Sequence, residues 1–249
     1  MRDKVFIVTG AASGMGRAAT EMLRAEGAMV YAADRQQDTL EQSCLSCGAL
    51  PRVVDISISA ECDLLVSNVV DEQGRLDGIV NFAGVLKRTG ILDCSNEEFD
   101  FVIDVNVKGC FYVCRAAARV MKVQGFGSIV NISSIWNDVG AAGVLAYCAS
   151  KGAVSQITRS AALDLAGSGV RVNEVCPGET NTPMLASERG FAMSQQDIDG
   201  KLEEIAATIP EKRLAEPREI AAAVLFLLSD ASSYMQGSSI TVDGGYKAR

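Results

Sequence analysis

The sequence predicts an α/β fold: one domain over residues 1–249, with a doubly wound parallel sheet covered by helices on both faces. Short apolar runs rich in Val and Ile alternate along the chain with longer amphipathic segments, which is the pattern of βαβ units. The short runs carry apolar residues at successive positions, as expected for strands that are covered on both faces. No long linker, low-complexity tract or internal repeat divides the chain, so one domain is the simplest interpretation.

The alternation places seven strands and six main helices. We expect strands near residues 4–9, 28–33, 50–54, 77–81, 127–132, 169–175 and 238–242. Helices fit between them at about 14–26, 36–46, 59–73, 96–122, 144–166 and 217–229. The segment after the sixth strand interrupts this rhythm, and we expect a substrate lid there, at about residues 179–210.

Charge and apolar content exclude two classes of partner. The formal net charge of −8 argues against a nucleic-acid surface, because phosphate contacts require clustered Lys and Arg. No apolar run reaches the roughly 20 residues of a membrane span. The N-terminus passes from Met1 straight into the apolar run Val5-Phe6-Ile7-Val8, without the regions of a signal peptide. We therefore expect a cytoplasmic protein that binds neither nucleic acid nor membrane.

Cysteine and histidine usage narrows the chemistry. Eight cysteines are scattered over the expected elements and do not form a disulfide framework. Cys44 and Cys47 are closely spaced, but no second pair lies nearby, which favours a helix end over a metal site. The chain has no histidine, so a Ser-His-Asp triad and a His-ligated zinc are excluded. We expect no metal, and any acid or base must be Tyr, Lys, Asp, Glu or Cys.

A glycine-rich turn joins the first expected strand to the first helix. Glycine is required where a chain turns tightly and where the backbone must approach a diphosphate without a Cβ in the way. The helix N-terminus that follows offers free N–H groups and the positive end of a dipole. This position, between the first strand and the first helix, favours cofactor binding over a purely structural turn. The turn reads Thr9-Gly10-Ala11-Ala12-Ser13-Gly14-Met15-Gly16.

Tyr147 and Lys151 are candidates for acid–base chemistry. They lie four residues apart on an expected helix, so both side chains share one face. A phenol has a pKa of about 10 and is a poor base at neutral pH, but a nearby ammonium group favours the phenolate and lowers that pKa. The pair can therefore act as a general base without histidine.

Two further polar residues lie where such a site needs them. Ser133 and Ser134 end the fifth expected strand, and ligands bind at the carboxyl edge of a parallel sheet. Ser134 precedes Tyr147 by thirteen residues. Asn106 lies inside a long apolar helix, where a polar side chain needs a reason such as a helix kink or a functional role.

These motifs together resemble the short-chain dehydrogenase/reductase family. The resemblance rests on Gly-x3-Gly-x-Gly after Thr9 and on the Tyr147-x3-Lys151 pair, and it continues in order along nearly the whole chain. It implies a Rossmann-type domain with a seven-stranded sheet in the order 3-2-1-4-5-6-7. It also implies hydride transfer between a nicotinamide cofactor and a secondary alcohol or ketone. The family's Ser-to-Tyr interval selects Ser134 rather than Ser133.

Asp34, at the end of the second expected strand, predicts NAD as the cofactor. A carboxylate there accepts hydrogen bonds from the adenosine ribose and repels the extra phosphate of NADP. Arg35 is a basic neighbour that could hold that phosphate, but an Asp in the first position usually decides for NAD in such families. Phe82 departs from the family's usual Asn. The resemblance adds further cofactor residues: Asp55 and Ile56 at the adenine, Asn81, Ala83 and Gly84 after strand four, and Pro177, Gly178, Thr180 and Thr182 near the nicotinamide.

The resemblance also implies a mechanism. Ser134 would hydrogen-bond the substrate oxygen and stabilise charge on it. Tyr147 would take the alcohol proton as the hydride leaves. Lys151 would hold the nicotinamide ribose and lower the Tyr147 pKa. Asn106 would anchor a water that links to Lys151, and reduction would run the same steps backwards.

The expected substrate pocket is mostly apolar, which favours a hydrophobic, cyclic or aromatic substrate over a sugar. Trp136, the single tryptophan, offers a stacking surface at its rim. Glu174 lies inside an otherwise apolar strand and requires a partner. We favour a paired structural group or a subunit contact over a catalytic acid for it. The other expected lining residues are Leu86, Ile135, Asn137, Leu145, Leu185, Phe191 and Met193.

Two alternatives remain open beside the NAD-dependent alcohol dehydrogenase. One is an NADP-dependent ketone or 3-oxoacyl-thioester reductase, against which Asp34 argues. The other is a non-catalytic NAD(H)-sensing module, against which the complete catalytic set argues. We also expect a homotetramer, because the last strand lies at a sheet edge and the long helices carry small residues such as Ala116-Ala117-Ala118 and Ala161-Ala162.

Overall fold

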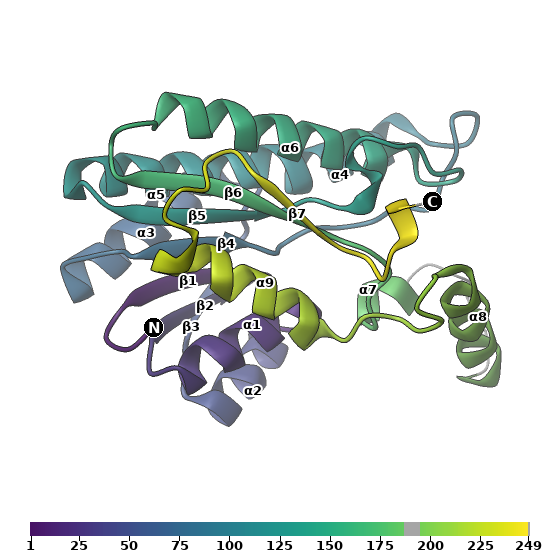
Figure 1. Ribbon diagram of the computed structural model, residues 1–249, viewed down its shortest axis with the longest axis horizontal. Helices are drawn as coiled ribbons and strands as arrows, with labels where there is room; N and C mark the ends of the chain where they lie inside the picture. Colours follow the sequence, from purple (N-terminus) through teal and green to yellow (C-terminus); the bar gives the residue numbers. More distant parts are fainter. Residues whose placement is uncertain (187–194, 249) are drawn as a thin grey trace.

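The computed structural model describes residues 1–186 and 195–248 and contains the predicted seven-stranded parallel sheet (Figure 1). The strand order is β3-β2-β1-β4-β5-β6-β7, so the chain starts in the middle of the sheet and winds outward in both directions. All seven strands fall where the sequence predicts them, and β6 runs two residues further than expected. The strands are β1 (Val5–Thr9), β2 (Met29–Asp34), β3 (Leu50–Val53), β4 (Gly78–Asn81), β5 (Gly127–Ile132), β6 (Val170–Pro177) and β7 (Ser239–Val242).

Helices cover both faces of this sheet (Figure 1). One face is covered by α3 (Ser59–Gln73), α4 (Asn96–Ile103), α5 (Cys110–Gln124) and α6 (Leu145–Asp164). The other face is covered by α1 (Gly14–Ala25), α2 (Gln37–Cys47) and α9 (Pro217–Leu228). No helix in the described part of the chain is both long and apolar enough to cross a membrane.

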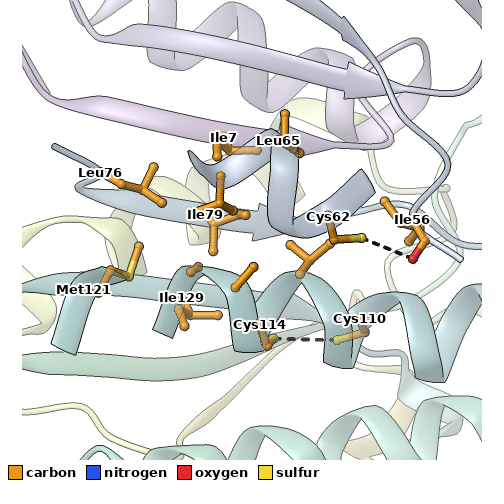
Figure 2. Close-up of a cluster of buried hydrophobic side chains, with 14 of the residues drawn as sticks. Ile7, Ile56, Cys62, Leu65, Leu76, Ile79, Cys110, Cys114, Met121 and Ile129 are labelled. Carbon is orange, nitrogen blue, oxygen red and sulfur yellow. Dashed lines mark hydrogen bonds between the residues drawn. The ribbon is translucent and has the colours of Figure 1, made fainter. Parts of the chain in front are cut away.

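The core has one large apolar cluster on each face of the sheet, because strand side chains alternate between the two faces. In β1, Ile7 packs into the cluster beneath α3 and α5, and Phe6 packs into the cluster beneath α1 and α9. Figure 2 shows the first cluster, in which Ile7, Ile79 and Ile129 from three adjacent strands face Leu65 of α3 and Met121 of α5. Burying each such side chain stabilises the fold by roughly 2 kcal/mol.

The long helix expected over residues 96–122 is interrupted. A π-helical segment, η1 (Asp104–Gly109), lies between α4 and α5. Asn106 occupies this segment and is buried. Its amide Oδ1 accepts a hydrogen bond from the Val85 N–H at 2.8 Å, and its Nδ2 donates to the Val85 carbonyl at 2.9 Å. The wider turn lets one side chain leave the helix and hold the chain that follows β4.

The segment after β6 contains the expected irregular region. It starts with the short helix α7 (Pro183–Ala186), and α8 (Gln195–Thr208) follows. Both lie at one end of the sheet, beyond the carboxyl ends of the strands (Figure 1). Phe191 and Met193, which we expected in the lid, lie outside the described residues.

Candidate active site

Two adjoining cavities lie along the carboxyl edge of the sheet. The first, of about 190 Å³, extends from the glycine-rich turn to the ends of β2 and β3, and we call it the cofactor cavity. The second, of about 230 Å³, lies between the end of β5, helix α6 and the turn after β6, and we call it the catalytic cavity. They share Met15, Phe82, Gly84, Thr182 and Met184, so together they form one cleft.

The glycine turn forms one wall of the cofactor cavity, and its glycines are required by space. Gly10 has a φ of +67°, and a Cβ there would lie 2.7 Å from the Ala83 nitrogen. Gly14 has a φ of +54°, with Thr182 across the opening. Gly16 does not line the cavity: a Cβ there would lie 2.2 Å from the Gly10 carbonyl oxygen. Gly16 therefore allows α1 to pack closely against the turn.

Asp34 lies at the far end of the cofactor cavity beside Arg35. Its Oδ2 accepts a hydrogen bond from the Ala12 N–H at 3.2 Å, and its Oδ1 accepts one from the Gln36 N–H at 3.0 Å. These contacts fix the carboxylate against the glycine turn. Asp55 and Ile56 line the same end. Hydrogen bonding to the Ser57 hydroxyl is the main cause that lowers the pKa of the Asp55 carboxyl.

Asn81 is the one residue of the expected cofactor set whose side chain lies behind the cleft. It is buried and lines neither cavity. Its Nδ2 donates to Asn131 Oδ1 at 2.8 Å and to Cys114 Sγ at 3.2 Å. The side chain therefore ties the ends of β4 and β5 to α5. Neighbouring Ala83 and Gly84 do line the cofactor cavity, as expected.

Three of the four expected catalytic side chains meet in the catalytic cavity. Ser134 follows β5, and Tyr147 and Lys151 lie one turn apart on α6. Ser134 and Lys151 are buried. The Lys151 ammonium group donates to the Ile132 carbonyl at 2.8 Å and lies 5.5 Å from the centre of the Tyr147 ring. The fold thus brings Ser134 together with Tyr147, which lies thirteen residues later in the sequence.

Burial shifts both acid–base groups toward their neutral forms. It raises the pKa of the Tyr147 phenol to about 12, while the hydrogen bond with Ser134 acts in the lowering direction. Burial also lowers the pKa of the Lys151 ammonium group to about 8. The cation that lowers the Tyr147 pKa in this structure is Arg88, whereas we expected Lys151 in that role. The net effect of burial and of these neighbours is to favour the neutral phenol.

Asn106 lies next to this site rather than in the cavity lining. Besides its two bonds to Val85, its Nδ2 donates to the Ser150 hydroxyl at 3.0 Å, next to Lys151 in the chain. A Cβ at Gly84 would lie 3.2 Å from Asn106 Oδ1 and 3.8 Å from the Lys151 nitrogen. The amide therefore lies on the same side as the lysine and holds the backbone that forms the cavity floor.

The substrate side of the catalytic cavity carries more polarity than expected. Leu86, Ile135, Trp136 and Leu185 line it as predicted, whereas Asn137 and Leu145 do not. Sequence reasoning missed Arg88 and Glu179, which also line it. Both act on the Tyr147 pKa, which Glu179 raises and Arg88 lowers. Their positions shortly after β4 and β6 were a usable signal, because loops at this sheet edge form the site.

The turn after β6 borders both cavities. Pro177, Gly178 and Thr180 line the catalytic cavity, and Thr182 lines both. The Thr180 hydroxyl donates to the Gly178 carbonyl at 3.0 Å, which holds this turn in shape. The expected nicotinamide-side residues therefore lie together where the two cavities join.

The residues present fit a nicotinamide dinucleotide. Positive-φ glycines leave open the space that side chains would otherwise fill, the N-terminus of α1 faces the cofactor cavity, and Asp34 lies at its far end. Such a cleft beside a Tyr–Lys pair with a buried lysine, on a doubly wound parallel sheet, defines the class of nicotinamide-dependent oxidoreductases.

Comparison with known proteins places the chain within this class. A family model described as enoyl-(acyl carrier protein) reductase matches residues 10–247. The chain is 39% identical over 255 residues to a cyclopentanol dehydrogenase of Comamonas sp., covering 100% of this chain and 98% of the relative. The chain belongs to the short-chain dehydrogenase/reductase family.

Two further matches agree. A 3-oxoacyl-(acyl-carrier-protein) reductase of Thermotoga maritima is 38% identical over 251 residues, covering 98% of each chain. The crystal structure of levodione reductase superposes with a TM-score of 0.94 at 34% identity, covering 100% of this chain and 99% of that one.

Proposed function

We propose that this enzyme oxidises a secondary alcohol to a ketone with NAD, and reduces the ketone in the reverse direction. The observation that carries the proposal is the meeting of Ser134, Tyr147 and Lys151 in the catalytic cavity. Bound NAD supplies the hydride acceptor. Everything else in the reaction is the work of the protein's own side chains.

Asp34 supports NAD over NADP. Its carboxylate is held by the Ala12 and Gln36 N–H groups, so it cannot turn away from the cavity without losing both bonds. A fixed negative charge favours ribose hydroxyls and repels a 2′-phosphate. Arg35 lies beside it in the same lining. We assign the preference to the carboxylate because it is the group held in place on two sides.

The proposed mechanism assigns one task to each residue. Ser134 donates a hydrogen bond to the substrate oxygen, and Tyr147 takes its proton as the hydride leaves. Lys151 holds the nicotinamide ribose and supplies positive charge near the phenol. Because burial keeps Tyr147 protonated on its own, the phenol reaches its basic form only when further positive charge is added nearby. Asn106 holds the adjoining backbone and a water path to Lys151.

The lining supports a compact, largely apolar substrate. Leu86, Ile135, Trp136 and Leu185 provide apolar surface, and the similar Comamonas protein is a cyclopentanol dehydrogenase. Arg88 and Glu179 add polar contacts, so we propose a cyclic or aromatic alcohol that carries one polar group away from its carbinol.

A second candidate is a 3-oxoacyl-thioester reductase that uses NADP, and its support is the similarity to the Thermotoga maritima reductase. The choice between the candidates depends on the cofactor and on the size of the substrate.

We further propose that the enzyme is a cytoplasmic homotetramer. The large apolar side chains exposed on α4–α6 are Phe99 at 37%, Phe111 at 43%, Leu163 at 78% and Val123 at 89% exposure, and they offer contact surface for a second copy. The alanines that we expected at such a contact are mostly inside the chain's own core, since Ala116, Ala117 and Ala162 are buried. β7 lies at the sheet edge, as expected.

The deciding experiment compares kcat/KM for NAD and NADP with cyclopentanol, an aromatic secondary alcohol and a 3-hydroxyacyl thioester. We expect NAD to be preferred with the cyclic or aromatic alcohol. Asp34→Ala should narrow the NAD-to-NADP ratio by about tenfold or more, corresponding to about 1.4 kcal/mol or more. A wild-type preference for NADP with the thioester would establish the second candidate instead.

A further inference from the structure

Glu174 is a fully buried carboxylate near the catalytic cavity. It lies in β6 between β5 and β7 and is 0% exposed. Its hydrogen-bond partners within the described residues are two hydroxyl groups and the Cys176 thiol rather than a cation. The Ser155 hydroxyl donates to Oε2 at 2.8 Å, and the Ser239 hydroxyl donates to Oε1 at 2.5 Å. Burying a carboxylate costs desolvation free energy, and the hydrogen bonds that Glu174 accepts in the folded structure offset this cost.

Ser155 connects this carboxylate to the site. It lies one turn after Lys151 on α6 and is itself buried. Besides donating to Glu174, its oxygen lies 2.9 Å from the Ser133 hydroxyl and accepts a hydrogen bond from Asn137 Nδ2 at 2.9 Å. One hydroxyl therefore joins a sheet strand, the end of β5 and the loop that follows it.

Each arm of this network ends beside a residue of the proposed reaction. Ser133 precedes Ser134, and its hydroxyl also donates to the Lys151 carbonyl at 3.0 Å. Asn137 follows Trp136, which lines the catalytic cavity. Because the Glu174 carboxylate accepts the Ser155 proton, the Ser155 oxygen is left to accept the hydrogen bond from Asn137. The carboxylate thus sets the direction of the hydrogen bonds that Ser155 makes with Glu174 and Asn137.

We propose that Glu174 is a positioning residue: acting through Ser155, it holds the segment from Ser133 to Asn137 against α6, and so places Ser134 and Trp136 relative to Tyr147. The catalytic consequence rests on the proposed function, whereas the structural consequence does not.

The conservative substitution separates hydrogen bonding from packing. In Glu174→Gln, the amide oxygen can still accept from Ser155 if its NH2 group faces the Ser239 hydroxyl, which can accept. Ser239 is exposed and can donate to water instead. Glu174→Ala removes the acceptor and leaves the Ser155 proton without its partner. We therefore expect near-normal behaviour for the Gln variant and a defect for the Ala variant. Ser155→Ala, which removes the linking hydroxyl, should reproduce that defect.

Asn173 provides the matched control. It is the preceding residue in β6, is equally buried, and faces the opposite side of the strand. Its Nδ2 donates to the Met235 carbonyl and its Oδ1 accepts from the Ser238 N–H, both at 2.9 Å. Asn173→Ala therefore breaks buried hydrogen bonds of the same strand without touching the Ser155 network.

The structural test uses Trp136, the single tryptophan, as a built-in probe. Acrylamide quenching of its fluorescence should increase at least twofold in Glu174→Ala and Ser155→Ala, and should stay at the wild-type value in Glu174→Gln and Asn173→Ala. Unchanged quenching in both Glu174→Ala and Ser155→Ala, or an equal increase in Asn173→Ala, would overturn the proposal. This readout requires no substrate, so it stands even if the proposed reaction fails.

The catalytic test is made with the best alcohol found for the wild type. Glu174→Ala and Ser155→Ala should lower kcat about 10- to 100-fold, as misplaced catalytic groups do, while the NADH dissociation constant changes less than about twofold. Glu174→Gln should recover most of the loss. A loss of NADH binding that parallels the loss of kcat would show a general structural defect and contradict the positioning role.

Discussion

The two cavities of the cleft differ in which parts of the chain form their walls. The cofactor cavity is shaped largely by backbone: Gly10, Gly14 and Gly84 leave space, and Asp34 is held by two N–H groups. The catalytic cavity is shaped by side chains from β5, α6, the turn after β6 and α7. A backbone-built cavity is encoded locally, whereas a side-chain-built cavity exists only after distant segments pack together.

The difference also separates binding from chemistry. The cofactor cavity is lined by the glycine turn, the Asp34 carboxylate and the Asp55 carboxyl, which can bind a ligand through hydrogen bonds. The catalytic cavity holds Tyr147 and Lys151, whose pKa values burial displaces to about 12 and about 8. Displaced ionisation of paired groups in a cleft is typical of acid–base sites. Substitutions in the cofactor cavity should therefore change KM for NAD, and substitutions in the catalytic cavity should lower kcat.

The largest expected effect is that of Tyr147→Phe. The change keeps the ring and removes the only oxygen that can take the substrate proton. We expect turnover to fall by about 10²- to 10⁴-fold while NADH still binds. Steady-state kinetics and fluorescence titration with NADH measure the two quantities. Near-normal turnover would remove Tyr147 from the proposed mechanism.

Ile56→Val is the comparison variant in the cofactor cavity. It removes one CH2 group from the end of that cavity that Asp55 also lines. We expect KM for NAD to rise by no more than about fourfold, for a loss of about 0.8 kcal/mol, and kcat to stay constant. A fall in kcat in this variant would contradict the assignment of cofactor binding to one cavity and of turnover to the other.

The next effect is on stability and comes from Lys151. Because burial lowers its folded-state pKa to about 8, the unfolded chain binds more protons than the folded chain between pH 8 and its ordinary value of about 10.4. Stability from this group therefore rises with pH across that window and is constant below it. Lys151→Met removes the dependence. Between pH 8 and 10, the stability of the wild type relative to this variant should rise by on the order of 2 kcal/mol, measured by urea unfolding. A pH-independent difference would contradict the lowered pKa.

The smallest expected effect is on substrate choice. Trp136 lines the catalytic cavity and packs edge-on against Tyr246, with ring centres 5.4 Å apart. Trp136→Ala should change the ratio of kcat/KM between a cyclic and a linear alcohol by roughly 3- to 10-fold, or about 1 kcal/mol, with NAD affinity unchanged. An equal loss for every alcohol would mean that the indole only supports the loop.

The sequence predicted the position of a residue correctly where that position depends on its immediate neighbours. Gly10 and Gly14 require positive φ angles inside one short turn, and Tyr147 and Lys151 need only one helical turn to share a face. The Asn81 side chain, which we expected at the cofactor, points instead to the α5 side, where Asn131 and Cys114 accept its hydrogen bonds. That direction is set by strand pairing, which no local pattern reports.

The small residues of the long helices show the same limit. Ala116 and Ala117 were expected at a contact between subunits, and they lie in the chain's own core. A small residue allows close packing both within the core of one chain and between two subunits, so the sequence does not distinguish these two kinds of contact. Asn106 shows the limit in another form: a polar residue in a helix was noticed, but its π-helical turn and its bonds to Val85 appear only once β4 and the helix are packed.

The sequence by itself determined the order of strands and helices, the glycine turn and the placement of Tyr147 and Lys151 on one face of a helix, because periodicity and short-range spacing carry this information. Only the tertiary structure decided which polar groups meet across the sheet. Glu174 finds its hydroxyl partners on α6 and β7, nineteen and sixty-five residues away, and Arg88 and Glu179 meet in one cavity from loops after different strands. The physical reason is that burial and hydrogen-bond partners belong to a packed arrangement of segments, and a carboxylate's charge, cost and role depend on what that packing places beside it.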